Sequence, residues 1–130
     1  MDFAFDHVHL ICRDPEAVAG YFERVFGGER ILDDPSFHGA PNIVVRVGSA
    51  KLFVRGVRPG EKPGPASPDA VMGLDHFSFT VEDTRAAAAF VKARGAEFIR
   101  EPAARGLGGR WTAFIRGPED IRIELSQRTI

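Results

Sequence analysis

The pattern of apolar and polar positions runs through this chain twice. In each half, a short apolar segment typical of a strand precedes an apolar stripe with helical spacing, and three more strand-like segments follow. The first half predicts strands over residues 3–12, 29–33, 42–47 and 51–57 and a helix over 15–26; the second predicts strands over 74–81, 96–100, 111–116 and 121–126 and a helix over 84–94. Each half is therefore expected to be a βαβββ module, and the fold class to be α+β.

The ends of the two predicted helices carry recognisable signals. Asp14 and Asp83 stand where N-caps are expected, because an aspartate oxygen can accept a hydrogen bond from an unpaired amide of the first turn. Pro15 suits the first helical position, and Gly27 and Gly28 predict a left-handed stop. One offset of 69 residues superposes the two halves without a gap and brings His7 onto His76.

Between the halves lies a proline-rich segment. It separates modules of about 1–57 and 74–130, and residues 58–73 hold four prolines, too many for a strand or a helix. We interpret 58–73 as a semi-rigid linker within one domain of 130 residues. The two halves of such a chain can pack together or be exchanged with a second copy, since either arrangement buries the same surfaces.

Composition narrows the classes of partner. The formal net charge is −1 with no cationic run, which argues against nucleic acid as a partner. No apolar stretch approaches the roughly 20 residues needed to cross a bilayer, and the acidic start lacks the basic flank of a secretory signal. We expect a cytoplasmic protein without a membrane partner. Cys12, the single cysteine, allows no internal disulfide and is expected to be a buried apolar residue.

The duplicated histidines, with one carboxylate, indicate candidate metal chemistry. Glu124 interrupts the apolar final strand and shares a face with Arg122 and Ser126. By itself this strand favours a plain amphipathic reading, with its polar side in water. With His7 and His76, however, Glu124 would complete a set of two histidines and one carboxylate, which suits Mn, Fe, Co, Ni or Zn and leaves coordination positions open.

These residues resemble the vicinal oxygen chelate superfamily, which includes glyoxalases, extradiol dioxygenases, fosfomycin-resistance thiol transferases and metal-free bleomycin-binding proteins. The resemblance rests on segments 6–8, 74–77, 113–118 and 123–125 and covers nearly the whole chain. It implies a cup-shaped mixed sheet of paired modules, a homodimer, and one divalent metal ion held by His7, His76 and Glu124. It also implies a small-molecule substrate that chelates the ion through adjacent oxygens.

The chain departs from the glyoxalase pattern at one position. Glyoxalases and many epimerases supply a fourth ligand from the last strand of the first half. The offset of 69 pairs Glu124 with Arg55, and a slip of one or two residues gives Val54 or Phe53. None of these side chains binds a metal ion. A three-ligand site therefore remains, and a mechanism that requires a second carboxylate is disfavoured.

Four further residues are candidates for substrate chemistry. His9 shares a strand face with His7 and is read as a general base, an outer partner of the metal site, a substrate contact or a structural histidine. Arg55 either presents its guanidinium to an anionic substrate or lies in solvent. Phe53 and Trp111 either line the pocket or belong to the core.

Two functions follow from this resemblance. The first is a metal-dependent enzyme with isomerase, lyase or group-transfer chemistry, in which Glu124 or His9 moves a proton. The second is a protein that binds a small molecule or antibiotic without chemistry, as the bleomycin-binding relatives do. The presence of all three ligand-type residues favours the enzyme.

Overall fold

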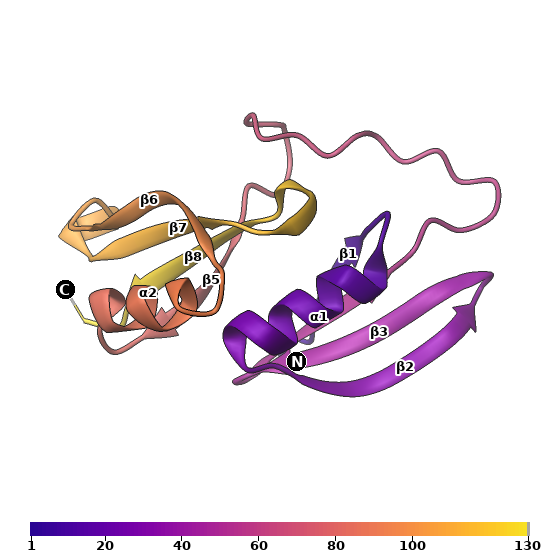
Figure 1. Cartoon of the computed structure of the whole chain (residues 1–130), viewed down its shortest axis with the longest axis horizontal. Helices are drawn as coiled ribbons and strands as arrows, with labels where there is room; N and C mark the ends of the chain where they lie inside the picture. The colour runs from indigo at the N-terminus through magenta and orange to yellow at the C-terminus, as the bar shows by residue number, and fades with distance from the viewer. Residues whose placement is uncertain (130) are drawn as a thin grey trace. The chain divides into compact units, whose positions relative to one another are not determined.

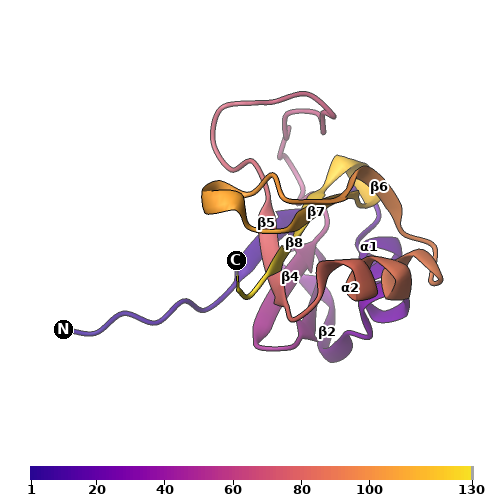
Figure 2. The same ribbon diagram turned by 90° about the vertical axis from the view of Figure 1, so that its left-hand side faces the viewer.

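The computed structural model describes residues 1–129 and divides the chain into two compact units. The first unit is Met1–Pro65, and the second begins at Ala66, so the boundary falls inside the predicted linker. Both units have the order βαβββ (Figures 1 and 2), which confirms the predicted fold class. No helix in the described part of the chain has the length and apolar character needed to span a membrane.

The first unit is a four-stranded sheet with one helix. Its elements are β1 (Val8–Ile11), α1 (Pro15–Phe26), β2 (Glu29–Phe37), β3 (Ala40–Val47) and β4 (Ala50–Arg55). The strand order is β1-β4-β3-β2, with β1 parallel to β4 and the other neighbours antiparallel. The helix α1 crosses from β1 at one edge of the sheet to β2 at the other, so that β4 comes back beside β1.

The second unit repeats this topology. Its elements are β5 (Phe77–Val81), α2 (Thr84–Lys92), β6 (Glu97–Ala103), β7 (Thr112–Arg116) and β8 (Arg122–Gln127), with short 3₁₀ turns η1 (Leu107–Gly109) and η2 (Pro118–Asp120). The strand order is β5-β8-β7-β6 (Figure 2), and β5 is again parallel to β8.

The helix ends follow the local sequence signals. The carboxylate of Asp14 accepts a hydrogen bond from the amide of Ala17 at 3.0 Å, Pro15 opens α1, and Gly27 closes it with a φ of 68°. Asp83 caps α2 in the same way. Both predicted N-caps are confirmed, although α2 ends earlier than expected.

Several predicted boundaries are wrong. The first strand of each unit starts later than predicted, at Val8 and Phe77. Residues 34–41, which fall between two predicted strands, are mostly strand, because β2 continues to Phe37 and a two-residue turn leads into β3. His38 and Gly39 form this turn with φ values of 55° and 88°, the left-handed pair that a tight hairpin requires. The irregular pairing between Asp34 and Phe37 accommodates Pro35.

Each helix covers one face of its own sheet. In the first unit, Val18, Phe22 and Val25 are fully buried together with side chains of β3 and β4, namely Ile43, Val45, Leu52 and Val54. In the second, Ala88 and Val91 share the core with Ala113, Ile115, Ile123 and Leu125. Cys12 is buried, as predicted. Because side chains alternate along a strand, the residues between these core positions point to the opposite surface, called here the helix-free face.

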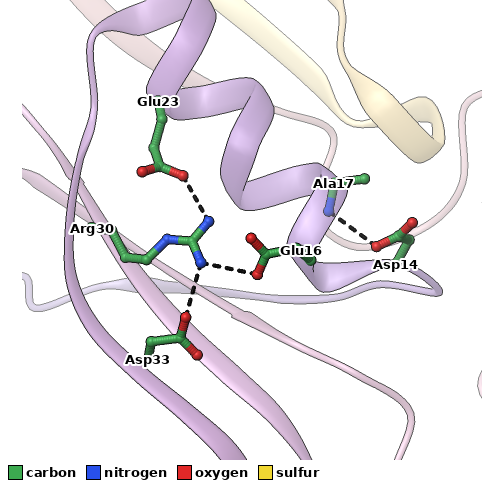
Figure 3. A network of polar contacts seen from close by, with 6 residues as sticks. All are labelled: Asp14, Glu16, Ala17, Glu23, Arg30 and Asp33. Atoms are coloured by element: carbon green, nitrogen blue, oxygen red, sulfur yellow. Dashed lines mark hydrogen bonds and ion pairs between the residues drawn. The ribbon is translucent and has the colours of Figure 1, made fainter.

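An arginine joins the edge strand of the first unit to its helix. Figure 3 shows the guanidinium of Arg30 on β2 between three carboxylates. It donates to Glu16 and Asp33 at 2.9 Å each and to Glu23 at 2.7 Å. These partners raise the pKa of Arg30. Since Glu16 and Glu23 belong to α1, the network fixes the outer strand to the helix, in addition to its backbone pairing with β3.

Arg30→Ala is expected to lower the free energy of unfolding by about 1–2 kcal/mol, because partly exposed ion pairs contribute about 0.2–1 kcal/mol each. The matched control is Arg46→Ala on the adjacent strand, which removes one exposed ion pair, to Glu29. That control should change stability by less than about 0.5 kcal/mol. Urea unfolding followed by circular dichroism measures both, and equal effects would show that the network adds nothing beyond a single pair.

Candidate functional site

An aspartate–histidine pair stands immediately before the first strand of each unit. The Nδ1 of His7 lies 2.6 Å from Asp6, and the Nδ1 of His76 lies 2.6 Å from Asp75. A carboxylate on Nδ1 fixes the orientation of the ring and leaves Nε2 as the lone-pair nitrogen. Hydrogen bonds from Lys51 and His7 lower the pKa of Asp6, and the bond from His76 lowers the pKa of Asp75.

The parallel pairing in the second unit brings one of these histidines to Glu124. Ser78 of β5 is paired with Glu124 of β8, so the residue just before β5 lies beside the carboxylate. The Nε2 of His76 is 3.8 Å from a carboxylate oxygen of Glu124. Phe114, which is opposite Glu124 on β7, meets the His76 ring edge-on with centroids 5.0 Å apart. Two of the three predicted ligands therefore face one another within one unit.

The first unit has an aromatic side chain where the second has Glu124. Val8 pairs with Leu52 and Phe77 pairs with Ile123, so the structural counterpart of Glu124 is Phe53. Pairing Glu124 with Arg55 by the gap-free offset is therefore wrong, and the two-residue slip describes the structure.

The turn before the last strand differs in length between the two units. Gly48 and Ser49 connect β3 directly to β4, whereas η2 lengthens the connection between β7 and β8. The last paired residues are Val47 and Ala50 in the first unit and Arg116 and Arg122 in the second. An insertion at this point shifts every later residue relative to the repeat.

Phe53 organises both histidines of the first unit. The His7 ring stacks on Phe53 with centroids 3.8 Å apart and an interplanar angle of 17°. His9, which is paired with Phe53 across β1 and β4, meets the same ring edge-on at 5.4 Å. Partial burial, and then the positive charges of His7, Arg55 and Arg58, lower the pKa of His9. His9 is accordingly a neutral imidazole near pH 7 that can accept a proton.

Arg55 is already engaged with a carboxylate of the chain. Its two terminal nitrogens donate to Glu61 at 2.7 and 3.0 Å, and its side chain is only 11% exposed. The pair, with the amide of Arg58, lowers the pKa of Glu61 to about 2. A substrate anion that binds Arg55 would have to displace Glu61.

Trp111 lies on the helix side of the second sheet. The guanidinium of Arg85 on α2 lies over its ring, 4.4 Å from the centroid. Its backbone carbonyl accepts hydrogen bonds from the Thr84 hydroxyl at 3.2 Å and the Gln127 amide at 2.9 Å. The structure therefore does not bring Trp111 together with Glu124, whose side chain is on the helix-free face.

A hollow of about 200 Å³ opens beside Glu124 in the second unit. Its lining includes Thr112, Phe114, Glu124 and residues 105–107. Within the described residues, neither unit by itself gathers three His, Cys, Asp or Glu side chains that could hold a metal ion. His7 belongs to the first unit, and His76 and Glu124 to the second.

The sequence analysis missed that Asp6 and Asp75 orient the two histidines, although the repeated Asp-His dipeptide signals these roles.

Comparison with known proteins identifies the family. A model of the Glyoxalase/Bleomycin resistance protein/Dioxygenase superfamily matches residues 4–125, so the chain belongs to this superfamily. This confirms the resemblance inferred from the sequence. A protein from Brassica oleracea var. gemmifera named "Putative lactoylglutathione lyase" is 34% identical over 65 residues. That match covers 50% of this chain and only 23% of the relative.

Solved structures show the same fold. The crystal structure of SMU.1112c aligns with a TM-score of 0.78 at 26% identity and covers 95% of this chain and 98% of that one. A mutant of the fosfomycin resistance protein FosX from Listeria monocytogenes aligns with a TM-score of 0.70 at 16% identity, over 97% of this chain and 90% of that one. The latter was crystallised with Mn(II) and 1S,2S-dihydroxypropylphosphonic acid. At this identity, the likeness to FosX shows the fold alone.

Proposed function

We propose that this protein is a metal-dependent enzyme that acts on a small molecule with adjacent oxygens able to chelate one divalent ion. The observation that carries the proposal is the arrangement of His76 and Glu124. Asp75 holds the Nδ1 of this histidine, and the free Nε2 faces the Glu124 carboxylate at 3.8 Å. Asp6 holds His7 in the same way, which is the outer arrangement typical of metal-binding histidines.

The donor set fits a first-row divalent ion. His7 and His76 would each offer a neutral imidazole nitrogen and Glu124 a carboxylate, a combination that suits Mn, Fe, Co, Ni or Zn. When bound, such an ion polarises the substrate oxygens that it contacts. Phe53 occupies the counterpart of Glu124, so the proposed site has three protein ligands and no fourth carboxylate.

His9 and Glu124 are the groups proposed to move a proton. His9 is neutral and stands beside His7, with ring centroids 5.7 Å apart. Without a second carboxylate, a proton taken from substrate would pass to His9 or Glu124. Isomerase, lyase and group-transfer reactions are all compatible with these residues.

A second candidate function is binding without chemistry. It is favoured by Phe53, whose ring stacks directly on His7 and gives the first unit an apolar surface where the second has a carboxylate. An aromatic surface of this kind can bind the flat part of a ligand without a metal ion.

Protein purified without an affinity tag, chelated and then offered Mn, Fe, Co, Ni or Zn, is expected to bind about one ion per chain by elemental mass spectrometry. His7→Ala, His76→Ala and Glu124→Ala should each lose most of that metal and remain folded. His38→Asn is the matched control, because His38 lies in a hairpin turn with a φ of 55°, which asparagine tolerates. Full occupancy in any of the three alanine variants would remove that residue from the site, and no binding in the wild type would favour the second function.

We also propose that the working form is a homodimer in which two chains share their sites. Mixing unfolded His7→Ala and Glu124→Ala chains and refolding them tests this directly. If each site takes His7 from one chain and His76 and Glu124 from the other, a mixed dimer contains one intact site and metal binding is partly restored. If each site lies within one chain, every site in the mixture lacks a ligand and no metal is recovered.

Turnover separates the enzyme from the binding protein. Metal-loaded protein is expected to convert a small compound with vicinal oxygens. His9→Gln should lower kcat by about 10²–10⁴, the usual contribution of a general base, and leave the metal content unchanged. Saturable binding of such compounds without conversion, detected by proton NMR, would support the binding function instead.

A further inference from the structure

Three arginines gather on the helix-free face of the second sheet. Arg116 and Arg122 are directly opposite one another across β7 and β8, and Arg100 on β6 is opposite Phe114. Directly opposed residues of a sheet share a face, so all three arginines lie on the face of Glu124. Two like charges opposite one another destabilise a strand pair. The sheet therefore keeps a costly pair at this point.

Acidic side chains of the protein lie at long distances from these arginines and neutralise them only weakly. Arg116 reaches Asp120 at 3.5 Å, and Arg122 reaches Asp75 at 3.4 Å. Within residues 1–129, Arg100 has no ion pair or side-chain hydrogen bond, and Glu97, opposite Arg116, makes no ion pair with it. By contrast, the structural arginines Arg30 and Arg55 hold their carboxylates at 2.7–3.0 Å.

The same three arginines line one hollow. It has a volume of about 120 Å³, and its other lining residues are Pro68, Ile99 and Asp120. Three arginines and one aspartate leave this arginine hollow with a formal net charge of +2. The Nε of Arg122 is buried and has no hydrogen-bond partner among the residues that the structure describes. The volume suits a compact group, since pockets for drug-sized ligands measure about 300–1,000 Å³.

We propose that the arginine hollow binds a tetrahedral oxyanion, the phosphate or phosphonate group of a small ligand. Guanidinium groups present forked donors that match such oxygens, and a dianion balances the net charge of the hollow. A carboxylate would balance only half of it. Occupation by a dianion also explains why two arginines are opposed across one strand pair.

The arginine hollow is next to the candidate metal site. Arg122 precedes Glu124 by two residues on one strand face, and Arg100 also lines the larger hollow beside Glu124. A ligand anchored by its oxyanion can therefore extend along Phe114 toward Glu124. This last step rests on the proposed function, whereas oxyanion binding does not.

The test uses the full chain after chelation, so that metal plays no part. Methylphosphonate and inorganic phosphate are titrated by isothermal calorimetry at constant ionic strength, with acetate as the carboxylate probe. Saturable binding of both phosphorus oxyanions, tighter than acetate, is expected. Arg100→Gln should raise the Kd at least about tenfold, since hydrogen bonds to charged groups are the strong ones, and Arg100→Gln with Arg116→Gln should abolish binding.

The controls distinguish this proposal from the previous one. Arg46→Gln removes an exposed strand arginine of the first unit and should leave the Kd unchanged. Glu124→Ala should also retain oxyanion binding, even if it loses metal. No saturable binding by the wild type, or equal binding by wild type and the double variant, would overturn the proposal. Tighter binding of acetate would reassign the hollow to carboxylates and overturn the tetrahedral assignment.

Thermal unfolding gives an independent readout. If Arg116 and Arg122 repel each other when the hollow is empty, Arg122→Gln should raise the Tm in low salt without phosphate. Added phosphate should then raise the Tm of the wild type more than that of the variant, because ligand binding stabilises the form that binds it. A variant less stable than the wild type under both conditions would show that Arg122 is structural and contradict the proposal.

Discussion

The parallel pairing of the first and last strands is the constraint on which the rest of each unit depends. In the order β1-β4-β3-β2 the last strand lies inside the sheet, next to the first, although the whole unit separates them in sequence. Because the two strands are parallel, residues just before the first strand lie beside the beginning of the last one. This is how His76 meets Glu124, and how His7 meets Phe53. In a simple antiparallel meander, the same residues would be separated by two strands.

Local chemistry determines most of what could be predicted about the fold. The caps at Asp14 and Asp83, the stop at Gly27 and the buried stripe of α1 depend on neighbouring residues, and all follow from the sequence. The predictions failed where distant contacts decide. The exposed, polar residues of β2 lack a strand pattern and are ordered by pairing with β3, so the sequence predicts no strand over residues 34–37. The two copies also differ in the length of the turn before the last strand, and a superposition of the sequences without gaps cannot represent that difference.

Some features of the candidate site could likewise be predicted from the sequence and others could not. The pairing of His76 with Glu124 was predictable because the residue types suggest the chemistry and the repeat suggests the position. The engagement of Arg55 was not, because its partner Glu61 lies beyond the strand in a segment without a recognisable pattern. The position of Trp111 was not predictable either. A shift of one residue moves a side chain to the other face of a strand, and Trp111 shares its face with the core residue Ala113, on the side of α2.

Because each helix covers only one face of its sheet, the two faces of a strand tolerate substitution differently. The covered faces of the two copies remain alike, with Leu52 and Val54 in one and Ile123 and Leu125 in the other. The helix-free faces keep the Asp-His pair but differ beyond it, with Phe53 stacked on His7 in one copy and Glu124 with nearby arginines in the other. Changes at core positions cost about 2–5 kcal/mol, whereas most surface changes cost under about 0.5 kcal/mol. Side chains on the helix-free face can therefore be replaced, and the binding chemistry changed, while the core and the fold stay the same.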